Sequence, residues 1–184
     1  MDLSIFTGKN DVSNFLRPVN GKRFALVNCR HDGLDLLELW DKNVMEFGSI
    51  MSNSDYEKQR NLEFVEKAKG DVFIAGFGIG LIVLPIINKP GVTSIEIVEN
   101  QQEIIDLIAS QLPLNEKVKI IKCNYFDFKP SHKYDTIYLD TIDEDKCTEE
   151  EKNSRIINGQ FYTDLDMIEN YKKYLKVGGD ISIF

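Results

Sequence analysis

The sequence has few cysteines, a deficit of basic residues and no long apolar run. Its three cysteines, Cys29, Cys123 and Cys147, are odd in number, far apart and without C-x-x-C spacing. This pattern predicts a reduced, cytoplasmic protein, and we expect no metal site. No apolar run approaches the roughly 20 residues of a membrane span. The first residues also lack the basic and apolar regions of a signal peptide.

Basic residues are outnumbered by acidic ones, 22 to 30, and the formal net charge is −8 at pH 7. Broad nucleic-acid binding requires a basic face, so this charge argues against it. The acidic excess is concentrated in residues 140–151, which hold seven acidic side chains and one lysine. This segment is either a solvated loop or a lip that attracts a cationic substrate.

Short apolar segments separated by turn residues open the chain and predict a small N-terminal β-hairpin or meander over residues 1–52. We expect strands at residues 22–29 and 36–40 and the start of a third strand at residues 44–47. His31-Asp-Gly33 is a turn signal between the first two. Residues 55–68 then carry apolar side chains on a charged background, which predicts an amphipathic surface helix.

Residues 53–184 alternate between strand and helix patterns, which predicts an α/β domain. The expected strands are 72–75, 92–98, 118–123, 136–139 and 181–184, and the expected helices are 81–88, 102–112 and 163–175. Such alternation implies right-handed βαβ units. We therefore expect a Rossmann-like three-layer sandwich with a mainly parallel sheet that is short at its C-terminal end.

The stretch after the first expected strand of this domain contains glycine at alternate positions, Gly76, Gly78 and Gly80. Glycines in a strand-to-helix turn let the backbone pass close beneath a ligand, because no Cβ intervenes. An acidic residue, Glu99, ends the next apolar run, at the usual place of the carboxylate that accepts ribose hydroxyls. The pattern predicts a nucleoside-binding site.

Five motifs extend this layout in order and spacing: the glycine loop at 72–80, the ribose carboxylate at 95–100, the adenine position at 122–126, and residues 134–140 and 175–179 at the fourth and fifth strands. In these residues the chain resembles class I S-adenosylmethionine-dependent methyltransferases, and within them the spermidine-synthase-like branch. The resemblance covers about residues 44–184. NAD is the competing ligand, but the loop lacks the third glycine of a dinucleotide site.

The resemblance implies S-adenosylmethionine, or its decarboxylated form, as the cofactor. The cofactor-binding residues that it implies are Gly76, Phe77, Gly78, Gly80, Glu99, Asn100, Asn124, Tyr125 and Asp140. Asn124 stands where the family commonly has an aspartate for the adenine amino group. An amide still offers an acceptor oxygen to that amine. Tyr125 either flanks the adenine ring or belongs to the core.

Asp140 and Asp143 are the candidate catalytic residues, because their Asp-x-x-Asp spacing matches that of aminopropyltransferases. The Pro- and Gly-containing loop that usually follows this motif in those enzymes is missing. Three readings stay open: a methyltransferase that acts on a small-molecule acceptor, neutral or cationic, a spermidine-synthase-like aminopropyltransferase, or a non-catalytic domain that binds the cofactor or a protein. A last strand with an open edge at residue 184 also predicts a homodimer.

Overall fold

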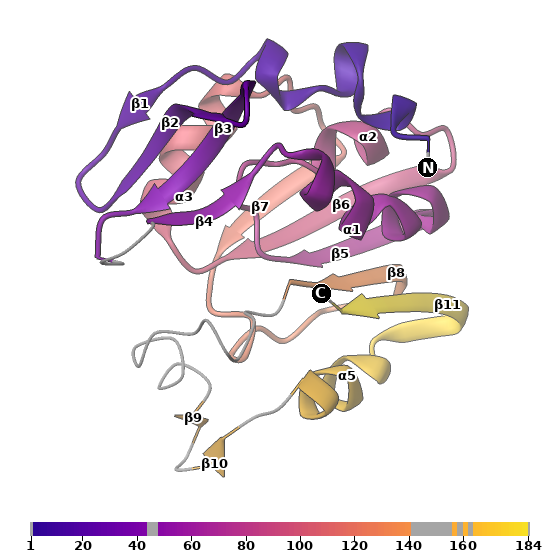
Figure 1. The fold of residues 1–184 in the computed structure, drawn as a ribbon. Helices are drawn as coiled ribbons and strands as arrows, with labels where there is room; N and C mark the ends of the chain where they lie inside the picture. The colour runs from indigo at the N-terminus through magenta and orange to yellow at the C-terminus, as the bar shows by residue number, and fades with distance from the viewer. Residues whose placement is uncertain (1, 44–47, 141–155, 158–159, 162–163, 184) are drawn as a thin grey trace.

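A five-stranded and a four-stranded sheet are the main parts of the structure (Figure 1). Side chains of both sheets belong to one hydrophobic core cluster. The computed structural model describes residues 2–43, 48–140, 156–157, 160–161 and 164–183. The larger sheet has the order β11-β8-β5-β6-β7, and every neighbouring pair is parallel. Its strands are β5 (Gly70–Ala75), β6 (Val92–Glu99), β7 (Val118–Lys122), β8 (Tyr134–Leu139) and β11 (Leu175–Ile183). The expected Rossmann-like parallel sheet is confirmed.

The smaller sheet is antiparallel and has the order β1-β2-β3-β4. Its strands are β1 (Val19–Asn20), β2 (Phe24–His31), β3 (Leu34–Asp41) and β4 (Ser49–Ser52), preceded by three short 3-10 helices. Asp32 and Gly33 both have positive φ, 49° and 83°, as a two-residue hairpin turn between twisted strands requires. The N-terminal meander is confirmed, and the expected third strand at residues 44–47 lies outside the described residues.

Alternate side chains of the central strand β5 point into two different cores. Val72 and Ile74 face the cluster that also contains α1 (Asp55–Lys67), α2 (Val83–Ile87), α3 (Gln102–Ile108) and the smaller sheet. Phe73 and Ala75 face a second cluster with α5 (Asp164–Lys172). A parallel sheet covered on both faces explains why its strands read as continuous apolar runs.

Three expected elements differ in extent. The helix expected at 81–88 is only the five-residue α2, and the helix expected at 102–112 ends at Ile108, where a 3-10 turn, Ala109–Gln111, follows. The last strand begins at Leu175, not at Ile181, because Leu175 already pairs with Tyr134. A register shift between Leu175 and Asp180 accommodates Gly178, whose φ is 77°.

The remaining described elements are a two-stranded antiparallel ribbon, β9 (Ile156–Ile157) and β10 (Gln160–Phe161). Among the helices described, none combines the length and the apolar composition that crossing a bilayer requires.

Candidate functional site

The glycine loop leaves the carboxyl end of β5, beside the ends of its neighbours β6 and β8. The Gly76 N–H donates to the Val98 carbonyl at 2.9 Å, and the Asp140 N–H donates to the Ala75 carbonyl at 3.0 Å. Gly76, Gly78 and Gly80 all have positive φ, from 50° to 96°. Residues with a Cβ rarely adopt this conformation, so the alternating glycines are a requirement of the loop's path.

Glu99, the expected ribose carboxylate, ends β6 and is only 6% exposed. Its two oxygens accept backbone N–H groups from Phe77 at 3.0 Å and from Gln101 at 2.7 Å. Burial raises the pKa of Glu99, and these backbone donors, with those of Asn100 and Gly78, oppose the rise. The Glu99 carboxylate is therefore held in place by backbone N–H groups of the glycine loop and of the residues that follow β6.

Asp140 follows β8 and lies against the start of the glycine loop. A Cβ at Gly76 would stand 3.1 Å from the Asp140 Cβ. Asp140 as a whole residue is exposed, yet desolvation by the protein atoms around its carboxyl, followed by repulsion from Glu57 and Glu99, raises the pKa of Asp140 to about 7. Arg60 opposes this rise. Carboxyl groups of α1 and β6 therefore lie near enough to Asp140 to raise its pKa.

The adenine position lies after β7. The Asn124 side-chain oxygen accepts the Phe126 N–H at 3.1 Å, and the Asn124 carbonyl accepts the N–H groups of Asp127 and Phe128. The rings of Tyr125 and Phe126 stack with centroids 4.4 Å apart, and both pack against the second core cluster. Asn124 thus folds its own loop, and its oxygen keeps one further lone pair for a ligand amine.

Met51 of β4 lies over the glycine loop. Its Sδ accepts the Ile79 N–H at 3.3 Å, and a Cβ built on Gly78 would collide with the same sulfur. Two hollows, of about 530 Å³ and 600 Å³, lie against the smaller sheet and contain no residue of the glycine loop. In this conformation the Met51 side chain of the smaller sheet occupies the space beside Gly78 that the lack of a side chain leaves open. We call this space the cradle.

The remaining expected residues are placed as follows. Phe77 is buried, 3% exposed, in the first core cluster, whereas Asn100 is exposed at the end of β6. A Cβ at Gly80 would meet Leu112, which gives that glycine a packing reason as well. Asp143 lies outside the residues that the structure describes.

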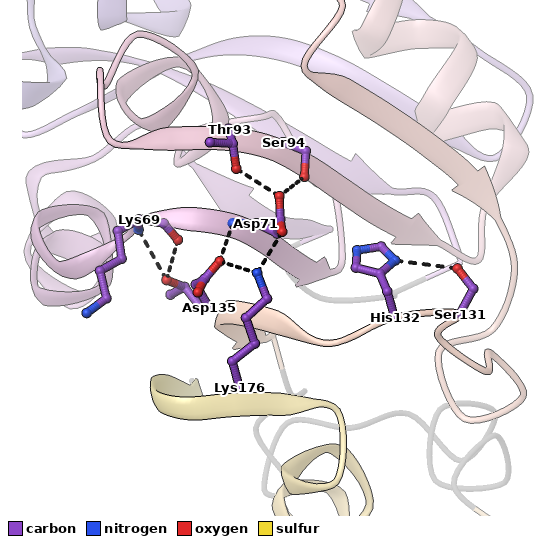
Figure 2. A network of polar contacts seen from close by, with 9 residues as sticks. Lys69, Asp71, Thr93, Ser94, Ser131, His132, Asp135 and Lys176 are labelled. Carbon is purple, nitrogen blue, oxygen red and sulfur yellow. Dashed lines mark hydrogen bonds and ion pairs between the residues drawn. The ribbon is translucent and has the colours of Figure 1, made fainter.

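The opposite, amino-terminal end of the sheet carries an ion network (Figure 2). Lys176 of β11 lies 2.8 Å from Asp71 of β5 and 2.7 Å from Asp135 of β8. Asp71 also accepts hydrogen bonds from Thr93 and Ser94, each at 2.8 Å. These residues join four strands, β5, β6, β8 and β11, at the end that does not hold the glycine loop, so Asp71 is a junction residue and not part of the candidate site.

Comparisons with known proteins were made for sequence and for structure. No family model and no curated protein matches the chain. Among solved structures, the N-methyltransferase NodS from Bradyrhizobium japonicum WM9 with S-adenosyl-l-homocysteine aligns at TM-score 0.52 and 12% identity, over 71% of this chain and 62% of that chain. The ribosomal protein L11 methylase from Lactobacillus delbrueckii subsp. bulgaricus aligns at TM-score 0.50 and 18% identity, over 71% and 60%. The chain has the class I methyltransferase fold.

The methyltransferase fold gives the glycine loop, Glu99 and Asp140 a common location, since ligands of such open α/β sheets bind at the carboxyl ends of the strands. At these identities the likeness establishes the fold, and the chain covers 67% of NodS in a second structure of that enzyme. The reaction must therefore be argued from the site itself.

Sequence reasoning missed two residues of this site, Met51 and Glu57. Met51 comes from another sheet, 28 positions from its partner Ile79, and no local pattern indicates that contact. Glu57 lies in the first turn of α1, where an acidic side chain is expected for helix stability alone. Nothing in the sequence around Glu57 indicates that it acts on Asp140.

Proposed function

We propose that the protein binds S-adenosylmethionine at the glycine loop and transfers its methyl group to a small acceptor. The observation that carries this proposal is the convergence of three chain segments. The left-handed glycine loop, the buried Glu99 carboxylate and Asp140 meet at the carboxyl ends of β5, β6 and β8, in a fold that NodS shares and uses to hold the demethylated cofactor.

The residues present suit this cofactor. Glu99 places a carboxylate beside the glycine loop for the ribose hydroxyls, and the Asn124 side-chain oxygen retains an acceptor position for the adenine amine. The absent side chain of Gly78 leaves a cradle that the Met51 thioether fills. A ligand in this cradle requires Met51 to move, and a methionine side chain has three rotatable bonds with which to do so.

Electrostatics favours the charged form of the cofactor. Glu99 and Asp140 place acidic groups beside the glycine loop, and S-adenosylmethionine carries a positive sulfonium at its reacting centre. An acidic site also favours a cationic acceptor, such as an amine. Bound S-adenosylmethionine supplies an activated methyl group, so the protein's tasks are to align the acceptor and to take up its proton.

Aminopropyl transfer is the second candidate function, since Asp140 begins the Asp-x-x-Asp spacing. It requires decarboxylated S-adenosylmethionine and a diamine in place of S-adenosylmethionine and a methyl acceptor. A non-catalytic domain that binds the cofactor or a protein partner is the third. The homodimer and the cytoplasmic location also stay proposals. For the dimer, β11 has a neighbour on one side only among the described strands.

The deciding experiment is isothermal titration of the purified protein with S-adenosylmethionine, its decarboxylated form, S-adenosylhomocysteine and NAD. We expect the adenosyl compounds to bind and NAD not to bind. Glu99→Ala should weaken binding by about 2–3 kcal/mol, because two hydroxyls lose a charged acceptor. Circular dichroism establishes that the variant is folded.

Glu96→Gln is the matched control. Glu96 is a buried acid of the same strand, but it bonds Tyr134 and Lys119, away from the loop. The Glu96→Gln variant should bind the adenosyl compounds with unchanged affinity. If folded Glu99→Ala binds as tightly as the unaltered protein, the site is misplaced. Preference for the decarboxylated compound, with turnover of a diamine, would replace the methyltransferase proposal by the aminopropyltransferase one.

A further inference from the structure

We propose that Cys29, His31 and Glu38 form a binding site for Zn²⁺ on the smaller sheet, separate from the glycine loop. Cys29 and His31 lie two positions apart on β2, so they point to the same face. Glu38 lies on the adjacent strand β3, opposite Val27, and shares that face. Leu26, Leu37 and Leu39 occupy the other face and belong to the core.

The three side chains converge closely enough to hold one ion. The Cys29 sulfur, a ring nitrogen of His31 and a carboxylate oxygen of Glu38 all lie within 4.8 Å of one another. The His31 Nε2 and the Glu38 Oε1 are 2.8 Å apart. Donors around tetrahedral zinc stand roughly 3.3–3.8 Å from each other, as bonds of about 2.0–2.3 Å require. Small side-chain rotations therefore bring the three donor atoms to the separations that one bound zinc ion requires.

The surroundings of Glu38 suit a metal ligand whose carboxylate is fixed in one orientation. It is only 6% exposed, although charged residues are rarely so buried unless paired. Its second oxygen, Oε2, accepts the Trp40 Nε1–H at 2.7 Å. Such a hydrogen bond from outside the ligand set fixes a carboxylate in orientation, which is the usual arrangement around protein metal ions. The Oε1 atom is thereby directed toward His31 and Cys29.

The donor set selects the metal. One thiolate, one imidazole and one carboxylate suit a borderline ion such as Zn²⁺, whereas Mg²⁺ and Ca²⁺ prefer oxygen ligands throughout. Three protein ligands leave a fourth position for water or an added ligand. The His31 side chain is 57% exposed, so the ion has a path from solvent. Binding displaces the Cys29 thiol proton into the buffer, because the thiolate is the ligand.

The chain contains its own reporter. Trp40 is its one tryptophan and donates to Glu38, so an ion at Glu38 changes the surroundings of the only indole. The protein is first dialysed against a chelator and then titrated with Zn²⁺ while tryptophan fluorescence is followed. We expect a saturable change at one ion per chain. Co²⁺, used as a spectroscopic substitute, should give a sulfur-to-cobalt charge-transfer band.

Variants identify the ligands. Cys29→Ser should remove the charge-transfer band, and both Cys29→Ser and Glu38→Gln should weaken Zn²⁺ binding at least about tenfold. Cys123→Ser is the matched control, a second partly buried free cysteine outside the cluster, and should change neither readout. Absence of saturable binding would show that the His31–Glu38 pair is an ion pair only. An unchanged cobalt band in Cys29→Ser would likewise overturn the proposal.

Discussion

At the scale of single residues, the two ends of the parallel sheet hold carboxyl groups whose pKa values move in opposite directions. At the amino end, hydrogen bonds from Lys176, Thr93 and Ser94 lower the pKa of Asp71 to about 2. At the carboxyl end, burial and the Glu57 carboxylate raise the pKa of Asp140 to about 7. Asp71 is thus a permanent anion that joins strands, whereas Asp140 exchanges its proton near neutral pH.

Asp140→Asn should abolish methyl transfer and change cofactor affinity little, because the amide cannot take up the acceptor's proton. In the unaltered protein the base is the deprotonated carboxylate, so turnover should rise with pH through about 7. The measurement is formation of S-adenosylhomocysteine with a panel of small amines, alongside titration of the cofactor. Transfer that persists at full rate in Asp140→Asn would remove Asp140 from the mechanism.

Asp71→Asn should lower the free energy of unfolding at pH 7 by about 1 kcal/mol, a value reduced for the partial exposure of the Lys176 pair. The folded-state pKa of Asp71 lies below its usual value of 3.8. Its contribution is therefore complete above about pH 4 and is lost as pH falls toward 2. Urea unfolding at pH 7 and pH 3 measures the difference between the variant and the unaltered chain, which should shrink at the lower pH.

The matched control for Asp71 is Glu63→Gln, which alters an exposed carboxylate paired with Lys67 along α1. Its effect on the free energy of unfolding should be too small to resolve, because solvent screens an exposed ion pair. Equal effects of the two substitutions would mean that the network in Figure 2 contributes no more than a surface ion pair.

At the scale of elements, β4 is a strand of the smaller sheet that contacts the glycine loop of the candidate site. It pairs with β3 through Leu39 and Met51, and the Met51 sulfur accepts the Ile79 N–H of the glycine loop. A ligand that must displace Met51 can bind only those molecules in which the Met51 side chain has moved away from the loop. Its apparent affinity is therefore its intrinsic affinity multiplied by the fraction of such molecules. β4 therefore connects the smaller sheet to the proposed cofactor site.

Met51→Ala should raise the affinity for S-adenosylhomocysteine severalfold, because the competing side chain is removed. Titration calorimetry measures the affinity. Ile50→Ala, which alters an exposed neighbour on the same strand, is the control and should have no effect. A weaker complex in Met51→Ala would show instead that the thioether contacts the bound ligand.

At the scale of the whole molecule, the sequence predicts what local patterns determine. Apolar runs and turn residues define β5, α1 and the hairpin turn at Asp32-Gly33, because these depend on neighbours along the chain. The expected start of β11 at residue 181 is wrong, because the pairing of Leu175 with Tyr134 sets where the strand begins. The contact of Met51 with the loop and the Cys29–His31–Glu38 cluster depend on sheet register and packing, which no local pattern encodes.

The shared core also predicts how the molecule unfolds. Leu39 of β3 is fully buried in the cluster that contains Ile74 of β5, so the smaller sheet and the parallel sheet bury each other's apolar surface. Leu39→Ala should lower the free energy of unfolding by about 2–5 kcal/mol. The whole protein should still unfold in one cooperative transition, at a lower temperature. Leu34→Ala, on the same strand but 64% exposed, should cost less than about 0.5 kcal/mol.

Calorimetry that resolves two transitions, with only the first sensitive to Leu39, would establish residues 1–52 as an independent folding unit. If a single transition is observed, a ligand that binds at the glycine loop, as proposed for the cofactor, should stabilise the smaller sheet as well, since both unfold together.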